Sequence, residues 1–197
     1  NIIVGTYSNG IFRSVDNGNT WTSHLGVLWI QALASIGPNV IAATRDGVYL
    51  SQDSGITWNS IRSGPAKWTE SVCFPVNSQT GYVCGSGMIM KTTNGGNEWI
   101  PQSADGNTVM FREILFPFDN ETGYVVGGTG RIFKTTDGGQ NLVRQIVFLG
   151  AELMDIDFPV NASTGYISGD RVILKTTNGG DNWEQLSSPT IFLTAIS

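Results

Sequence analysis

The stretch Thr92-Thr93-Asn94-Gly95-Gly96-Asn97-Glu98-Trp99 decides the fold class, because the chain contains five versions of it. Each version has the form Ser/Thr-x-Asp/Asn-x-Gly-x-x-Trp, except that Leu142 replaces the Trp of the fourth. The five copies begin at Ser14, Ser51, Thr92, Thr135 and Thr176. They recur about every 40 residues, a period typical of propeller blades made of short strands. The sequence therefore predicts an all-β repeat protein.

The chemistry of this stretch predicts a tight turn in every copy. We expect the side chain at its third position to accept hydrogen bonds from backbone N–H groups two residues on, while Gly supplies a positive φ. These turn residues are Asp16, Asp53, Asn94, Asp137 and Asn178. Because backbone donors engage their side chains, we interpret them as structural and not as proton-transfer groups.

Each repeat contains four short strand patterns, which in the third repeat cover residues 70–74, 81–85, 88–92 and 98–102. We therefore predict four-stranded antiparallel blades in a single domain, residues 1–197. The predicted blades cover residues 1–24 plus 191–197, 25–63, 64–104, 105–148 and 149–190.

The two ends of the chain predict how the propeller closes. The first repeat lacks an opening strand, and residues 192–197 align with residues 29–34, the opening strand of the second repeat. We expect a five-bladed ring, sealed by pairing of the C-terminal strand with the N-terminal blade, and hence a monomer. The alternative is an excised or engineered piece of a larger propeller.

The turn stretches resemble the Asp-box, or BNR, repeat. Three flanking segments extend the likeness: Phe74-Pro75 with Thr80-Gly81-Tyr82, Phe116-Pro117 with Thr122-Gly123-Tyr124, and Phe158-Pro159 with Thr164-Gly165-Tyr166. They resemble repeats of the photosystem II stability and assembly factor family. The resemblance covers essentially the whole chain and implies a propeller with a chaperone or scaffold role.

Composition excludes several classes of function. A net charge of −5 with 11 Lys and Arg residues opposes nucleic-acid binding, which depends on neutralising phosphates. Apolar runs are too short to span a bilayer, so we expect no membrane insertion. Two Cys and one His predict no metal site and no cofactor. Cys73 and Cys84 lie on neighbouring predicted strands, which makes them a candidate disulfide and suggests an exported, periplasmic or extracellular protein. The alternative is a pair of reduced cysteines packed as small hydrophobic residues.

The rim opposite the Asp-boxes varies between repeats, so we expect any binding site there. Aromatic and Met side chains at this rim could stack on a sugar or hold an apolar segment, and charged residues could add polar contacts. The alternatives are blade packing and ordinary solvated ion pairs. The candidate rim residues are Trp29, Trp68, Glu70, Met110, Arg112, Arg131, Glu152, Arg171 and Phe192.

One pair of carboxylates is a candidate for catalysis. We predict no other catalytic residues. Glu113 and Asp155 occupy equivalent positions in adjacent repeats, and glycoside hydrolysis needs two carboxyl groups across a cleft. We favour a non-catalytic propeller that presents its rim to a protein or peptide. A carbohydrate-binding module or a weak glycoside hydrolase is the alternative.

Overall fold

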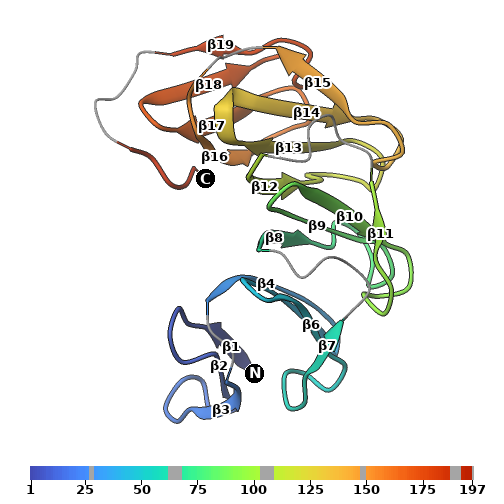
Figure 1. The fold of residues 1–197 in the computed structure, drawn as a ribbon, viewed down its shortest axis with the longest axis vertical. Helices are drawn as coiled ribbons and strands as arrows, with labels where there is room; N and C mark the ends of the chain where they lie inside the picture. The colour runs from blue at the N-terminus through green and yellow to red at the C-terminus, as the bar shows by residue number, and fades with distance from the viewer. Residues whose placement is uncertain (27–28, 62–67, 103–108, 147–149, 187–191, 197) are drawn as a thin grey trace. The chain divides into compact units, whose positions relative to one another are not determined.

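The computed structural model describes residues 1–26, 29–61, 68–102, 109–146, 150–186 and 192–196. In these segments the regular structure is β-strand, apart from one short 3-10 turn, η1 (Gly128–Gly130). The strands form one three-stranded and four four-stranded sheets (Figure 1). The predictions of an all-β fold and of four-stranded antiparallel blades are therefore confirmed for four repeats. Within the described segments no helix is long and apolar enough to cross a bilayer.

The sheets follow the order of the repeats. The first contains β1 (Ile2–Gly5), β2 (Ile11–Ser14) and β3 (Thr22–Leu25). The second contains β4 (Ile30–Ile36), β5 (Asn39–Thr44), β6 (Gly47–Ser51) and β7 (Asn59–Ile61). The third contains β8 (Thr69–Cys73), β9 (Gly81–Gly85), β10 (Met88–Thr92) and β11 (Ile100–Pro101). The fourth contains β12 (Phe111–Leu115), β13 (Gly123–Gly127), β14 (Arg131–Thr135) and β15 (Val143–Ile146). The fifth contains β16 (Leu153–Asp157), β17 (Gly165–Gly169), β18 (Val172–Thr176) and β19 (Glu184–Gln185).

The predicted strand bounds of the third repeat are close to the observed ones. β9 and β10 have the predicted bounds, and β8 begins and ends one residue earlier than expected. β11 is shorter than predicted because Trp99 belongs to the turn, where its indole N–H donates to the Gly96 carbonyl oxygen at 3.1 Å.

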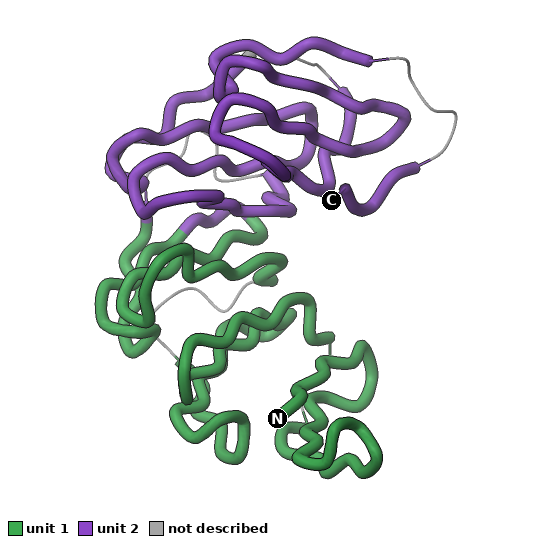
Figure 2. The backbone as a smooth tube through the Cα atoms, turned by 180° about the vertical axis from the view of Figure 1, so that it is seen from behind, with its two compact units in different colours: residues 1–86, 90–101 green, residues 87–89, 102–197 purple. Residues whose placement is uncertain are grey.

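The chain forms two compact units, which Figure 2 shows in different colours. The first unit contains residues 1–86 and 90–101, and the second contains residues 87–89 and 102–197. The assignment of residues 1–197 to a single domain remains a prediction.

The second strands of the second to fifth blades are largely buried, and this explains the recurrent Phe-Pro and Thr-Gly-Tyr segments. Every residue of β9 and β13 is buried. A Cβ atom on Gly123 would lie 2.4 Å from the ring of Phe116, and Gly81 and Gly165 meet Phe74 and Phe158 in the same way. The glycine is therefore needed because the Phe ring of the first strand's end packs directly on it.

The Asp-box turns have the same geometry in all five copies. In the first, Gly18 N–H donates to the Ser14 hydroxyl at 2.8 Å, and that hydroxyl donates to Asp16 Oδ1 at 2.8 Å. Asp16 Oδ1 also accepts from the N–H of Thr20 at 2.9 Å. The expectation of a backbone donor two residues on is wrong, because the turn is wider: the donor is four residues on. The structural interpretation of Asp16 and its counterparts is otherwise supported by these bonds.

In the four blades with four strands, the Asp-box turn is hydrogen-bonded to the turn between the first and second strands of the same blade. Backbone N–H groups of the Asp-boxes donate to carbonyl oxygens of these turns at 2.8–2.9 Å: Ser54 to Pro38, Gly95 to Gln79, Gly138 to Glu121 and Gly179 to Ser163. Both kinds of turn therefore lie at the same end of each blade, as predicted. The opposite ends form what we call the variable rim.

The C-terminal residues contact the fifth blade in the same way that β4, the first strand of the second blade, contacts the first blade. Leu193 N–H donates to the Gly169 carbonyl oxygen at 3.3 Å. At the aligned position, Ile30 N–H donates to the Thr6 carbonyl oxygen at 3.2 Å. Phe192 also forms an isolated antiparallel bridge with Asp170. This matches the predicted alignment of the two segments. In the described residues β1 pairs with β2, and pairing of β1 with the C-terminal segment remains a prediction.

Candidate functional site

Backbone hydrogen bonds place the residues that precede the first strands at the variable rim. The carbonyl oxygens of Trp68, Met110 and Glu152 accept N–H groups from the turns between second and third strands, at 2.8–2.9 Å. These turns lie at the blade ends opposite the Asp-boxes. The three residues are thus on the predicted side of their own blades.

The first unit brings four side chains together at this rim, and we call them the aromatic cluster: Tyr7, Trp29, Arg45 and Trp68. The rings of Trp29 and Trp68 have centroids 5.8 Å apart and an interplanar angle of 54°. Arg45 Cζ lies 3.9 Å from the Trp29 centroid and 4.3 Å from the Trp68 centroid. Tyr7 stacks on Trp29 at 4.5 Å. Two of the three predicted aromatic rim residues, Trp29 and Trp68, therefore belong to one surface cluster.

Trp29 holds an unusual backbone conformation in this cluster. Its φ is +63°, which is sterically costly for a bulky side chain. Its N–H donates to the Tyr7 carbonyl oxygen at 2.9 Å, and its carbonyl oxygen accepts from Arg45 N–H at 3.2 Å. The two hydrogen bonds fix this conformation. Strained backbone of this kind is common at functional sites.

Tyr7 and Arg45 were not among the residues predicted to form the rim site. Both lie in turns that follow second strands, after β1 and β5 respectively. The alignment of residues 1–6 with residues 39–44 puts Tyr7 and Arg45 at the same repeat position, next to the opening residues of the following blades. Aligning the turns between the second and third strands of the repeats could therefore have identified both residues from the sequence.

Charged residues of the second unit pair with each other at the variable rim. Arg112 donates from Nε at 2.9 Å and from Nη2 at 2.6 Å to the same oxygen of Glu152, Oε1. Both side chains are half-buried. In the first unit, Glu70 Oε2 accepts from the amide of Gln31 at 3.1 Å. Three predicted rim residues are therefore engaged in polar contacts between neighbouring blades.

The remaining predicted rim residues differ in their exposure. Arg131 is half-buried at the start of β14, and Met110 is half-buried just before β12. Arg171 has an exposed side chain, 3.6 Å from Asp170, and Phe192 is exposed. The gathering of all the candidates around one channel mouth remains a prediction.

The two candidate catalytic carboxylates lie at equivalent positions of β12 and β16. Glu113 is opposite Val126 and Asp155 is opposite Ser168 in the strand register. Asp155 accepts backbone hydrogen bonds at both oxygens, from Ile156 N–H at 2.8 Å and from Ile196 N–H at 2.9 Å. Through these hydrogen bonds Asp155 holds the C-terminal segment. Because both of its oxygens already accept backbone N–H groups, Asp155 is less suited to act as a catalytic acid or base.

Cys73 and Cys84 lie on neighbouring strands, as predicted, but they are not directly opposite each other. Cys73 is opposite Tyr82 and Cys84 is opposite Ser71. The β-bulge between Thr69 and Ser71 adds a residue to the first strand, which sequence comparison alone did not reveal. The two side chains are diagonal neighbours on one face, and both are thiols.

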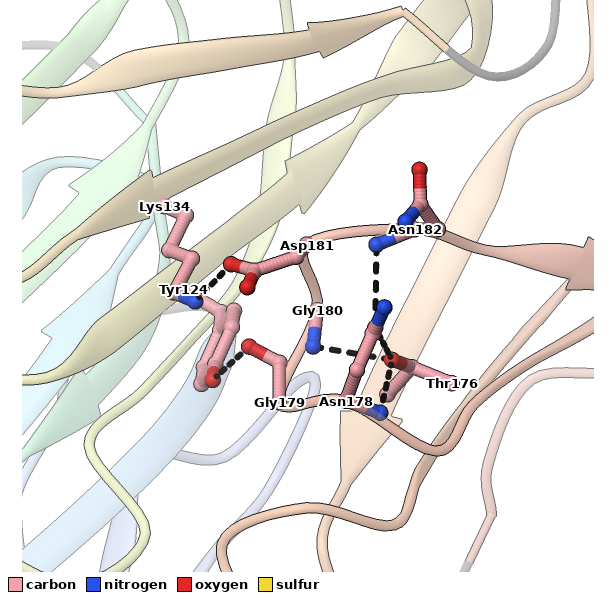
Figure 3. A network of polar contacts seen from close by, with 8 residues as sticks. All are labelled: Tyr124, Lys134, Thr176, Asn178, Gly179, Gly180, Asp181 and Asn182. Atoms are coloured by element: carbon pink, nitrogen blue, oxygen red, sulfur yellow. Dashed lines mark hydrogen bonds and ion pairs between the residues drawn. The ribbon is translucent and has the colours of Figure 1, made fainter.

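A polar network joins the fourth and fifth blades at the Asp-box end (Figure 3). Tyr124 donates its hydroxyl to the Gly179 carbonyl oxygen at 2.7 Å, and Lys134 Nζ lies 2.6 Å from Asp181 Oδ1. Burial, with a smaller contribution from the negative charges of Asp181 and Asp119, raises the pKa of Tyr124 to about 12. In the described residues no group of three or more His, Cys, Asp or Glu side chains could hold a metal ion.

Comparison with protein families matches residues 50–153, more than half of the chain, to the photosynthesis system II assembly factor YCF48 family. The chain belongs to this YCF48 family. The expected family resemblance is thereby confirmed. No curated protein sequence matches the chain significantly.

Solved structures show the same fold at low identity. A YCF48 protein from Cyanidioschyzon merolae is 15% identical with a TM-score of 0.65, covering 89% of this chain and 66% of that one. An ancestral GH74 enzyme is 19% identical with a TM-score of 0.78, covering 93% and 29%. The GH74 xyloglucanase from Xanthomonas campestris is 17% identical with a TM-score of 0.72, covering 93% and 36%.

These identities show a shared propeller fold and do not by themselves establish a shared activity. The YCF48-family chain studied here spans about a third of the length of the two GH74 proteins and about two thirds of the Cyanidioschyzon merolae protein.

Proposed function

We propose that this YCF48-family chain is a non-catalytic propeller that binds a protein or peptide at its variable rim. The aromatic cluster carries the proposal. Tyr7 is 61% exposed, and Trp29, Arg45 and Trp68 are half-buried. Clustered Trp, Tyr and Arg side chains are the residue types that dominate binding energy at protein interfaces.

The Asp-box end of the blades is less suited to bind a partner than the variable rim. Its Asp and Asn oxygens accept N–H groups from their own turns, so these side chains serve the fold first. The family is described as a photosynthesis system II assembly factor, and a protein partner agrees with that description. The proposal therefore agrees with both the distribution of satisfied polar groups and the family.

The experiment is an array of synthetic peptides probed with the purified chain and with Trp68→Ala. Removing one central aromatic anchor should weaken binding by about 2 kcal/mol, or about 30-fold. The matched control is Phe118→Ala, which removes a 50% exposed aromatic ring from the Asp-box end of the fourth blade. Equal binding by wild type and folded Trp68→Ala would overturn the proposal, as would the absence of any bound peptide.

A carbohydrate ligand is the second candidate, and the exposed Tyr7 ring favours it. A sugar needs an open aromatic face on which to stack. Trp29 already contacts Tyr7 and Arg45, so much of its ring is covered within the cluster. We therefore place carbohydrate second, and a glycan array probed with Tyr7→Ala tests it. For hydrolysis the candidate residues remain Glu113 and Asp155.

The chain's alignment also supports a five-bladed ring closed by its C-terminal strand, and a monomer. The proposed closing strand already has the opening-strand contact with the fifth blade through Leu193 and Gly169. Light scattering coupled to gel filtration should give a monomer of 21.2 kDa. Concentration-dependent association would favour an open arc. Export to the periplasm or the extracellular space remains a prediction, because the register of Cys73 and Cys84 does not favour the disulfide that suggested it, and cell fractionation tests it.

A further inference from the structure

Arg45 is held differently from the other arginines whose contacts the structure describes. Arg13 donates to the Ser54 carbonyl oxygen at 2.9 Å, and Arg112 donates to Glu152. Arg171 lies near Asp170. The guanidinium of Arg45 contacts the rings of Trp29 and Trp68 instead, and the described segments supply it with no hydrogen-bond acceptor or ion pair.

Contacts with aromatic rings position a guanidinium without satisfying its N–H groups. A cation held within about 6 Å of an indole ring is attracted by the ring quadrupole, but the five in-plane N–H donors still need acceptors. Arg45 is half-buried, so part of the group faces solvent. The aromatic cluster therefore presents a positioned cation with open donors next to the exposed Tyr7 ring.

The chemistry that satisfies such a group is a carboxylate. Carboxylate oxygens accept two parallel N–H bonds from arginine, and these charge-assisted bonds are about twice as strong as neutral ones. Polyanions fit less well, because the chain carries a net charge of −5 and two acidic residues lie close to the cluster in sequence: Asp46 follows Arg45, and Glu70 is two residues from Trp68. A single carboxylate gains the contact without placing further negative charge there.

We propose that Arg45 forms a carboxylate-binding site within the aromatic cluster, and that the bound partner is a peptide that presents an Asp or Glu side chain next to an apolar residue. Arg45 binds the carboxylate, and the Tyr7 ring packs on the apolar neighbour. The inference rests on the proposed peptide-binding function and specifies the chemistry of the partner.

Matched peptide arrays test this site. One array carries peptides attached through their C-termini, each Asp or Glu peptide beside its Asn or Gln counterpart. The second carries the same peptides attached through their N-termini with free C-terminal carboxylates. We expect wild type to prefer acidic side chains by at least about tenfold over the matched amides on both arrays. A preference that requires the free C-terminus would overturn the assignment to a side chain.

Three variants complete the experiment. Arg45→Gln should abolish the acidic preference, and Arg45→Lys should keep it with weaker binding, because a lysine retains the charge and loses the forked donors. Arg144→Gln is the control, since it removes the same charge from an exposed position on β15. Circular dichroism confirms that each variant is folded.

The outcomes separate this inference from the proposed function. Peptide binding that depends on Trp68 but keeps its acidic preference in Arg45→Gln would overturn the carboxylate site and leave the binding function standing. Loss of the preference in Arg144→Gln as well would overturn the site, because net charge alone would then explain it. The absence of peptide binding by wild type would overturn both.

Discussion

Arg45 and Trp29 are joined through both side chain and backbone. Arg45 Cζ lies 3.9 Å from the Trp29 ring centroid, and Arg45 N–H donates to the Trp29 carbonyl oxygen at 3.2 Å. The turn after β5 thereby holds Trp29, the residue that precedes the first strand of the same blade, β4. This double contact explains how a bulky residue is kept at a positive φ on an exposed rim.

The backbone of Trp29 leads to an unusual order of variant stabilities. Trp29→Ala and Trp29→Gly both lose the ring, but only Gly adopts a φ of +63° without steric cost. We expect Trp29→Gly to be more stable than Trp29→Ala by about 1 kcal/mol in urea unfolding. At Trp68, which is not at positive φ, Ala should equal or exceed Gly. Greater stability of Trp29→Ala would show that the backbone is not strained.

The Asp-box carboxylates predict a loss of stability in acid. Hydrogen bonds from the Thr20 hydroxyl, the Thr20 N–H and the Ser14 hydroxyl lower the pKa of Asp16 from its usual 3.8 to about 2. The ionised form is thus favoured by folding. Its contribution is present above pH 4 and is lost as the pH falls through the folded-state pKa.

Melting temperatures between pH 5 and pH 2 test this effect. Asp16→Asn should show a shallower fall than wild type, because the amide does not titrate and its oxygen accepts the bonds from the Ser14 hydroxyl and the Thr20 N–H at every pH, although the bond from the Thr20 hydroxyl to Oδ2 is lost. Asn178→Asp, which introduces a carboxylate into the fifth Asp-box, is the converse variant and should steepen the fall. Identical slopes in all three proteins would contradict the pKa shift.

Tyr124 predicts a loss of stability in alkali. Its raised pKa of about 12 means that the unfolded chain releases this proton first, so stability falls as the pH rises from about 10 to 12. Tyr124→Phe should reduce that fall and should cost about 1 kcal/mol at neutral pH, through the lost hydrogen bond to Gly179. Ultraviolet titration should show one of the five tyrosines ionising late. Ionisation of all five near pH 10 would be inconsistent with the buried hydroxyl.

The diagonal register of the cysteines predicts two thiols and no disulfide. Diagonal neighbours on adjacent strands have Cα atoms about 7–8 Å apart, which exceeds the usual disulfide separation. Thiol titration in denaturant without reductant should detect both Cys73 and Cys84. In the native protein Cys84 should react more slowly, because it is fully buried. An absence of reactive thiols would restore the disulfide prediction.

The sequence predicted the parts of the fold that repeat. Five Asp-boxes predicted the turns. The Phe-Pro and Thr-Gly-Tyr segments supplied the family resemblance, but the packing of the Phe116 ring on Gly123 was seen only in the structure. The bulges of the first strands and the wider Asp-box turn were missed, because one added residue changes register without changing the apolar pattern. The register error for Cys73 and Cys84 has this cause.

The candidate site was predicted less completely than the fold. Trp29 and Trp68 were found because they share a repeat position and have large rings. Arg45 was missed because its importance comes from contacts with two residues distant in sequence. Arg112 and Glu152 were found as charges, but their mutual ion pair required the packing of neighbouring blades.

Hydrogen exchange of the chain with and without its strongest array peptide tests the central claim most directly. The account predicts slower exchange at the variable rim of the first unit, around Trp29, residues 44–47 and Trp68, with little change in the Asp-box segments 51–58 and 92–99. Protection confined to the Asp-box segments, with the aromatic cluster unchanged, would contradict it.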